Sequence, residues 1–238
     1  MTDKSKTYKY ILIYIYLLVA IAVLLYRFPG LYQFNKRESL QEEIDSKDEY
    51  ILGGYLKDGQ MFNTEEMYFP IALPGEMSRY IYYIDSYGAV RTYGGDRVHE
   101  GCDIMTRNNI RGELPVVSVC DGVIEKLGWL ELGGYRVGIR SETGVYYYYA
   151  HLDSYAQGIE EGDIVSAGQV IGYVGDTGYS KVEGTTGNFD VHLHFGVYVN
   201  DEDGCEYALN PYPLLEVIKK SVIKYRLDCF NVSKYMIE

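Results

Sequence analysis

The stretch DVHLHFG, residues 190–196, places two histidines two positions apart. Apolar residues alternate with the histidines, and a period of two is typical of a half-buried strand. Side chains at positions i and i+2 of a strand share a face, so His192 and His194 project the same way, about 7 Å apart along the chain. One imidazole of such a pair can bind a metal ion while the other moves a proton. An isolated H-x-H motif is more often an ordinary exposed or hydrogen-bonded pair.

His99 begins the run HEGCD, which offers Asp103 as a second metal ligand. An extended strand would hold these two side chains about 13 Å apart, too far to share one ion, so the chain must bend, and Gly101 permits a bend. A helix would also bring them together and would make Glu100 a base of the zincin type. Zincins end this motif in histidine, however, and Gly101 is a poor helix residue, so we reject the helix.

His151 follows the tyrosine-rich run YYYYA. Alternation predicts that Tyr147, Tyr149 and His151 share one face, with the histidine at the end of the strand. The four histidines and Asp103 together suit metal-assisted hydrolysis. Two imidazoles and one carboxylate leave the fourth position of a zinc ion for water, which is the catalytic arrangement. Two further imidazoles remain to move protons and to stabilise an oxyanion.

The composition narrows the class of protein. The chain has 238 residues, 47% of them hydrophobic, and a net charge of −12. It carries no basic cluster beyond the ends of its N-terminal segment, so nucleic acid is not an expected partner. Its 27 tyrosines suit partly exposed sheet faces and grooves. No cysteine lies in a C-x-x-C motif, and the four are compatible either with disulfides or with small core residues: Cys102, Cys120, Cys205 and Cys229.

The elements that must position these residues are mainly β. Over residues 76–212, short apolar runs are cut by glycines at regular intervals, which predicts an antiparallel sheet or sandwich. Apolar residues at helical spacing over 212–227 predict a terminal helix packed on the sheet, within a C-terminal helix and tail over 213–238. Residues 28–75 are interpreted as an acidic connector whose second half is irregular.

An uncharged run, YILIYIYLLVAIAVLLY, lies between Lys9 and Arg27. It is slightly shorter than the about 20 residues that span a bilayer, but its terminal tyrosines and flanking cations suit the interfaces. We expect a transmembrane anchor over 10–27 preceded by a short tail over 1–9. A cleaved signal peptide is the rival, although its cleavage-like AIA motif is followed by further apolar residues. Basic residues on the two sides balance, so charge alone does not set the orientation.

Several spaced motifs resemble those of the LytM/lysostaphin-type zinc metallopeptidases, which cut peptide bonds in bacterial peptidoglycan. The signature segments are VHEGCD (98–103), YAHL (149–152) and VHLHF (191–195), supported by PVVSVCDGVI, GDIVSAGQVIGYVGDTG and LNP. The resemblance covers about residues 85–215 and implies a peptidase domain with one zinc ion per chain.

The resemblance also implies a role for each residue. His192 and His151 would be the catalytic pair that orients the attacking water, accepts its proton and stabilises the tetrahedral intermediate. Tyr93, six residues before the first ligand, occupies the position of a tyrosine that the family uses to stabilise the same intermediate. The implied zinc ligands are His99, Asp103 and His194.

Two features depart from the family pattern. The link between Gly178 and His192 is longer than usual, which leaves the substrate preference open. Cys102 lies between two implied ligands, but we expect it to point away from the metal because its neighbour Asp103 points toward it in extended chain.

The sequence therefore predicts a membrane-anchored zinc endopeptidase that hydrolyses cross-links or stem peptides of peptidoglycan. Because peptidoglycan lies outside the membrane, residues 1–9 would be cytoplasmic and the catalytic domain extracytoplasmic. The alternative within the family is a scaffold or regulator of envelope or spore assembly that binds a protein partner without turnover. Such members usually lack a motif residue, whereas all five metal and histidine positions are present here. A metal-storage or sugar-binding β domain would explain only the H-x-H motif.

Overall fold

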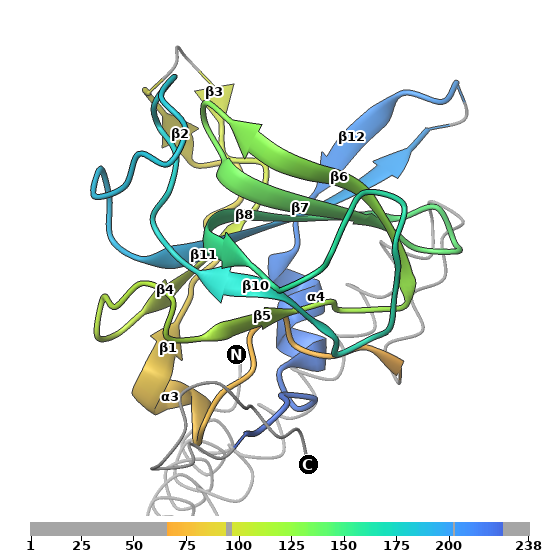
Figure 1. The fold of residues 1–238 in the computed structure, drawn as a ribbon. Helices are drawn as coiled ribbons and strands as arrows, with labels where there is room; N and C mark the ends of the chain where they lie inside the picture. Colours follow the sequence, from red (N-terminus) through yellow and green to blue (C-terminus); the bar gives the residue numbers. More distant parts are fainter. Residues whose placement is uncertain (1–65, 94–96, 202, 226–238) are drawn as a thin grey trace, which may run out of the picture. The chain divides into compact units, whose positions relative to one another are not determined.

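The computed structural model describes residues 66–93, 97–201 and 203–225 (Figure 1). The expected membrane anchor, the connector up to residue 65 and the tail beyond residue 225 lie outside the described residues. Within the ranges that are described, no helix is both long and apolar enough to cross a membrane.

The described chain is mainly β, as predicted, with ten strands joined in one sheet and two more in a separate hairpin. In chain order the elements are α3 (Met77–Tyr80), β1 (Ile81–Tyr82), β2 (Val90–Arg91), β3 (Arg97–Val98), β4 (Cys102–Thr106), β5 (Pro115–Val117), β6 (Gly122–Leu130), β7 (Gly134–Arg140), β8 (Tyr146–Tyr155), β9 (Ile164–Val165), β10 (Val170–Val174), β11 (His192–Asn200), β12 (Glu206–Leu209) and α4 (Tyr212–Ile218).

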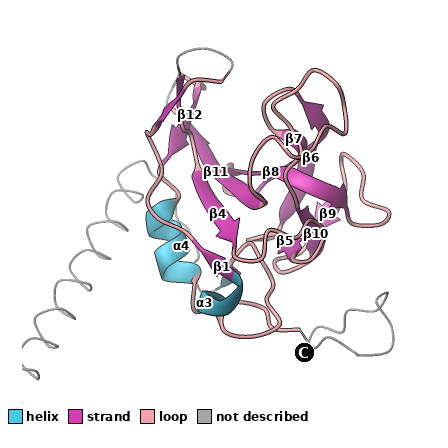
Figure 2. Ribbon diagram, turned by 90° about the vertical axis from the view of Figure 1, so that its left-hand side faces the viewer, coloured by secondary structure: helices cyan, strands magenta, loops and turns pink. Residues whose placement is uncertain are grey.

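The sheet has the strand order β1-β4-β11-β8-β7-β6-β9, with β12 paired to β11 and with β10 paired to β8 and β5. All of these pairings are antiparallel. The two-sheet sandwich that the sequence also allowed is therefore replaced by a single curved sheet. Figure 2 shows α3 and α4 together beside β1 and β4, where Tyr83 donates a hydrogen bond to Glu216 of α4 at 2.9 Å. The central strands β4, β11, β8 and β7 carry the residues of interest.

Alternate residues of the central strands enter the core on one face. In β11, Leu193, Phe195 and Val197 are fully buried, and the two histidines of the strand lie on the opposite face, as the alternation predicts. The phenol oxygen of Tyr149 in β8 accepts a hydrogen bond from the amide of Val119 at 2.9 Å, so its polar atom is satisfied inside the core.

The core begins before residue 76, where the sequence pattern places the domain boundary. The amide of Val117 donates to the carbonyl of Pro70 at 2.9 Å, so this segment is hydrogen-bonded to β5. The two prolines at 70 and 74 hide a period-2 pattern that otherwise is typical of a strand. Its buried residues are Met67, Phe69, Ile71 and Leu73.

The terminal helix is shorter than predicted, because α4 ends at Ile218. Leu215 and Ile218 are buried, as the helical spacing requires. Tyr225 is also buried, but its amide donates to the carbonyl of Leu73 at 3.2 Å in extended chain. The prediction of a helix beyond residue 218 was therefore wrong, because the later apolar residues pack as extended chain against the segment at 67–73.

Candidate active site and metal centre

Three of the predicted residues converge on one point. Asp103 of β4 and His194 of β11 lie directly opposite each other in the sheet register, and His99 lies three residues before β4. His99 Nε2 is 2.8 Å from His194 Nδ1 and 2.9 Å from Asp103 Oδ1, and the last two atoms are 3.1 Å apart. These atoms form a group that could hold a metal ion.

The donor set fits a zinc ion. Tetrahedral zinc with bonds of about 2.0–2.1 Å places its ligand atoms about 3.3 Å apart, a few tenths of an ångström beyond the observed spacing. The Nδ1 atom of His99 faces the carbonyl of Ser86 at 2.8 Å and must carry a proton to donate to it, which leaves a lone pair on Nε2. Such a backbone partner fixes the tautomer of a metal-binding histidine.

Gly101 explains how the chain brings these residues together. It lies at the predicted bend before β4, and a β-carbon there would come within 2.6 Å of the His194 ring and 2.7 Å of the Phe195 carbonyl oxygen. Glycine therefore permits the bend and also the close approach of β11. Cys102 is fully buried and donates a weak hydrogen bond to the carbonyl of Ile84, so its thiol points away from the donor cluster, as expected.

The charges of the cluster suit metal binding. Burial raises the pKa of Asp103, but the neighbouring imidazoles of His194 and His99 outweigh it and hold this pKa well below the usual range. Burial lowers the pKa of His194. The carboxylate is thus ionised and the imidazole neutral at pH 7, which are the forms that coordinate a metal.

His151 and His192 lie beside the cluster, with ring centroids 4.8 Å apart. Each ring is oriented by a backbone carbonyl: His192 Nδ1 donates to Asp190 at 2.6 Å and His151 Nδ1 to Thr177 at 2.8 Å. Burial lowers the pKa of both. Both rings are therefore neutral at pH 7 with a lone pair on Nε2, which is the state a general base requires.

His151 does not share a face with Tyr147 and Tyr149, contrary to the prediction. The two tyrosines are buried in the core, whereas His151 lines the pocket with Tyr148. The backbone of His151 is left-handed, with φ of 63°, and the register between β7 and β8 shifts at this point. An extra residue of this kind reverses the alternation and costs about 1–3 kcal/mol of strain, a device found at functional sites.

The structure does not bring Tyr93 to the donor cluster. Its ring stacks on Tyr179 with centroids 4.5 Å apart, and its hydroxyl donates to the Tyr179 carbonyl at 2.5 Å. Tyr93 is absent from the residues that line the pocket. The catalytic role that the resemblance implies for Tyr93 stays a prediction.

The long link before β11 supplies two aromatic residues that sequence reasoning did not single out. The ring of Phe189 lies 4.5 Å from His151 and 5.1 Å from His192, and Tyr179 meets His151 edge-on at 5.7 Å. The sequence did contain a signal for them, because two aromatic residues in the long link before the H-x-H motif indicate an aromatic wall beside the histidines.

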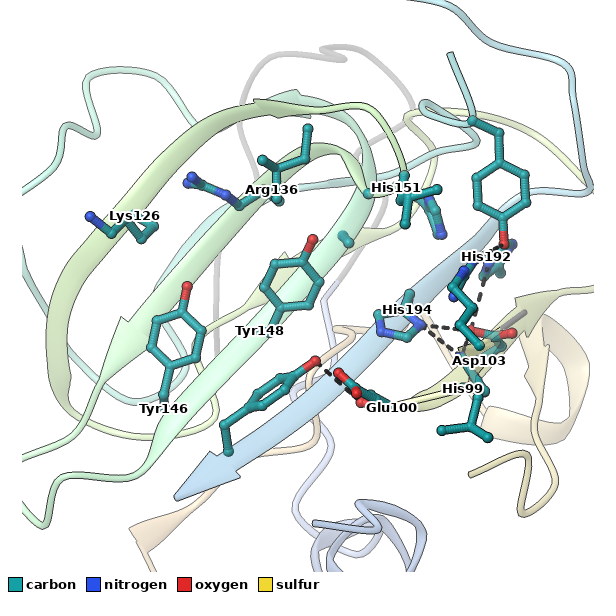
Figure 3. Close-up of a pocket in the computed structure, with 18 residues that line it drawn as sticks. His99, Glu100, Asp103, Lys126, Arg136, Tyr146, Tyr148, His151, His192 and His194 are labelled. Atoms are coloured by element: carbon teal, nitrogen blue, oxygen red, sulfur yellow. Dashed lines mark hydrogen bonds and ion pairs between the residues drawn. The ribbon is translucent and has the colours of Figure 1, made fainter. Parts of the chain in front are cut away.

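The four histidines line a pocket of about 510 Å³ (Figure 3). Tyrosines of β8 and β11 form its base, and the exposed face of the sheet continues from the metal centre toward β7 and β6. Its charged residues are Arg97, Glu100, Asp103, Lys126 and Arg136.

Described cysteines form no disulfide: Cys102, Cys120 and Cys205 are free. Cys229 lies outside the described residues. Burial raises the pKa of the Cys102 and Cys120 thiols to about 12, so these two behave as core residues.

The model of peptidase family M23 matches residues 97–204. The L-Ala–D-Glu endopeptidase of Bacillus subtilis (strain 168) is 44% identical over 62% of this chain and 42% of its own length. Lysostaphin of Staphylococcus staphylolyticus is 36% identical over 50% of this chain and 22% of its own length. The chain thus spans less than half of either relative.

A solved structure from Ruminococcus gnavus ATCC 29149, described as a glycyl-glycine endopeptidase of the LytM type, is 49% identical. The alignment covers 69% of this chain and 65% of that one, with a TM-score of 0.62. Residues 97–204, the region that the family model matches, contain the donor cluster and both additional histidines. By these matches the chain contains a peptidase M23 domain over residues 97–204, homologous to LytM, lysostaphin and the L-Ala–D-Glu endopeptidase.

Proposed function

We propose that this chain is a zinc metalloendopeptidase that hydrolyses peptide bonds of bacterial peptidoglycan. One observation carries the proposal: His99 Nε2, Asp103 Oδ1 and His194 Nδ1 lie within 3.1 Å of one another in a pocket that also holds two neutral histidines. The names of two relatives, an L-Ala–D-Glu endopeptidase and a glycyl-glycine endopeptidase, support peptidoglycan as the substrate.

The residues divide the work by their protonation states. His99, Asp103 and His194 would hold the zinc ion, which when bound acidifies water and polarises the scissile carbonyl. His192 Nε2 lies 3.8 Å from Asp103 Oδ1 and so borders the metal position. Its lone pair accepts the proton of the attacking water, and the resulting imidazolium donates it to the leaving amine.

His151 completes the pair from the opposite strand. Its ring is held by the Thr177 carbonyl and by the Phe189 ring, so its Nε2 is fixed relative to His192. Because its Nδ1 carries the proton, its Nε2 lone pair would accept a hydrogen bond from the attacking water and orient it. The aromatic wall excludes water from both imidazoles and thereby strengthens these interactions.

The test uses the full chain, loaded with zinc and incubated with purified peptidoglycan, beside a His192→Ala variant. Mass spectrometry of the released muropeptides would find new amino termini with the wild type and none with the variant, although both bind one zinc ion per chain. The new termini would name the bond. Zinc bound by both proteins without new termini on several wall chemistries would contradict the proposal and favour a scaffold that binds an envelope or sporulation partner.

We also propose that residues 10–27 anchor the chain in the bacterial cell membrane, with the catalytic domain outside. The uncharged run between two basic residues and the external position of peptidoglycan support this topology. Cys205 is exposed and therefore suits labelling. In a Cys229→Ser background, a membrane-impermeant maleimide added to intact cells should label the chain, and this labelling should be lost when Cys205 is also replaced by Ser. Protection of Cys205 until lysis would contradict this orientation.

A further inference from the structure

The pocket contains a pair of cations away from the metal centre. The sheet register sets Lys126 opposite Gly138 and Arg136 opposite Gly128, so the two cations are diagonal neighbours on one face of β6 and β7. Diagonal positions of this kind have α-carbons about 7–8 Å apart, close enough for both long side chains to reach one ligand. Figure 3 shows both side chains on the side of the pocket that faces away from the labelled histidines.

Neither cation has an acidic partner among the described residues. Arg140, four residues farther along β7, shows what an arginine on this strand does when carboxylates are at hand. It binds Glu125 at 2.6 and 3.1 Å and Glu206 at 3.0 Å. Arg136 makes no such bond, and its Nη1 atom is buried without a hydrogen-bond partner. A buried guanidinium nitrogen left unpaired is costly, which indicates a ligand that pairs with it.

The position of this atom makes it unusual. Four side-chain atoms of the described residues are buried without a hydrogen-bond partner. Of these four, only Arg136 Nη1 belongs to a residue that lines the pocket of the metal centre. The two positive charges also lie side by side in a chain whose net charge is −12. The two carboxylates that line the pocket, Glu100 and Asp103, belong to the segment at the metal centre.

We propose that Lys126 and Arg136 form a carboxylate-binding subsite that selects substrate peptides with a free carboxylate near the scissile bond. This inference rests on the proposed function, since it assigns the acidic stem peptides, rather than uncharged glycine bridges, as the substrate class. A guanidinium binds a carboxylate through two parallel hydrogen bonds, and the neighbouring ammonium adds a second positive charge.

The distance to the metal centre agrees with a subsite on the same peptide. Ala150 of β8 pairs with His194 of β11. On the other side of β8, Tyr149 pairs with Val137 and Leu152 with Tyr135, so Arg136 of β7 lies beside the same stretch of β8. Two strand spacings of about 4.8 Å separate β7 from β11, or about 10 Å. An extended peptide covers this in about three residues, so a carboxylate within three residues of the cleaved bond reaches Arg136.

The test compares two synthetic peptides that differ in one group: L-alanyl-γ-D-glutamyl-L-lysine with a free α-carboxylate on the glutamyl residue, and the same peptide with an α-carboxamide. Hydrolysis kinetics and calorimetric binding are measured with the zinc-loaded full chain and with the Arg136→Gln and Lys126→Gln variants. Lys220→Gln removes the same charge from an exposed position outside this pocket and is the matched control. Zinc content and circular dichroism establish that each variant is folded.

The wild type should bind the carboxylate peptide about tenfold or more tightly, seen as a lower KM with a similar kcat. Both pocket variants should lose this preference while the Lys220→Gln control keeps it. Equal affinity of the wild type for the two peptides, or a preference retained by Arg136→Gln, would overturn the subsite. If the wild type hydrolyses neither peptide, the proposed function fails for this substrate, whereas a calorimetric preference that disappears in Arg136→Gln still supports the subsite.

Discussion

Arg91 donates a hydrogen bond to Asp103 Oδ2 at 2.5 Å, while Oδ1 of the same carboxylate faces the two imidazole nitrogens of the donor cluster. The guanidinium of the small β2–β3 hairpin thus fixes which oxygen is available to a metal ion. Partners of this kind hold a ligating carboxylate in one orientation and typically change metal affinity when they are removed.

Replacing Arg91 should therefore weaken zinc binding. Arg91→Met keeps the length of the side chain and removes the hydrogen bond, and the zinc dissociation constant should rise about 10- to 100-fold in a chelator competition assay. Arg97→Met is a suitable control because Arg97 pairs with Arg91 across the hairpin but makes its side-chain bonds to Tyr93 and Tyr179. Tighter zinc binding by Arg91→Met would mean instead that Arg91 competes with the metal for Asp103.

Gly101 should tolerate no side chain. In Gly101→Ala, the new β-carbon would collide with the His194 ring and with the backbone oxygen of Phe195, so β11 must move away from β4. We expect loss of bound zinc and a decrease of about 1–3 kcal/mol in the free energy of unfolding. Metal analysis and urea denaturation measure the two effects. In Gly75→Ala, the new atom would meet only the Tyr80 ring at 3.3 Å, and zinc content should not change; a stoichiometric zinc content in Gly101→Ala would contradict the account.

Local periodicity explains which parts of the site could be predicted. A strand period of two places His192 and His194 on one face whatever lies around them, and the bend at Gly101 follows from the short reach between His99 and Asp103. The face of His151 depends on contacts far away in sequence. Its amide donates to the Gly133 carbonyl at 2.7 Å, in a backbone conformation that no local pattern indicates.

The fold shows the same division. The repeated apolar runs predict antiparallel strands, but they do not determine that the strands join in a single sheet. The segments at 67–73 and 223–225 form backbone hydrogen bonds with residues far away in sequence. Prolines in the first segment and helix-like spacing in the second hide their extended structure in the sequence pattern. The cation pair of Lys126 and Arg136 depends on the register of β6 and β7, which the sequence did not reveal.

The ion pair of Glu125 and Arg140 should make stability depend on pH. The hydrogen bond from Arg140 lowers the pKa of Glu125 below its value of about 4.3 in unfolded chain. The pair therefore stabilises the fold above that pH, and the stabilisation is lost as the pH falls through the lowered pKa. Because Glu125 is partly exposed, Glu125→Gln should cost about 1 kcal/mol or less at pH 7.

This difference between the wild type and Glu125→Gln should shrink toward zero below about pH 4, as the free energy of unfolding from urea titrations would show. Glu142→Gln, at an exposed position, should have the same free energy of unfolding as the wild type both at pH 7 and below about pH 4. A difference for Glu125→Gln that stays constant down to pH 3 would assign its effect to packing rather than to charge.

Phe189 should act as a positioning residue for the two catalytic imidazoles. Phe189→Ala removes the ring that contacts both His151 and His192, so the imidazoles gain freedom and their alignment with the attacking water suffers. We expect kcat to fall about tenfold or more with little change in KM and with zinc content unchanged. Nitrogen-15 NMR of the histidine rings measures the gain in motion without any substrate. Val182→Ala, at an exposed position of the same segment, should leave the kinetics and the ring signals as they are; rigid imidazole signals together with an unchanged kcat in Phe189→Ala would show that the remaining backbone carbonyl bonds position the rings alone.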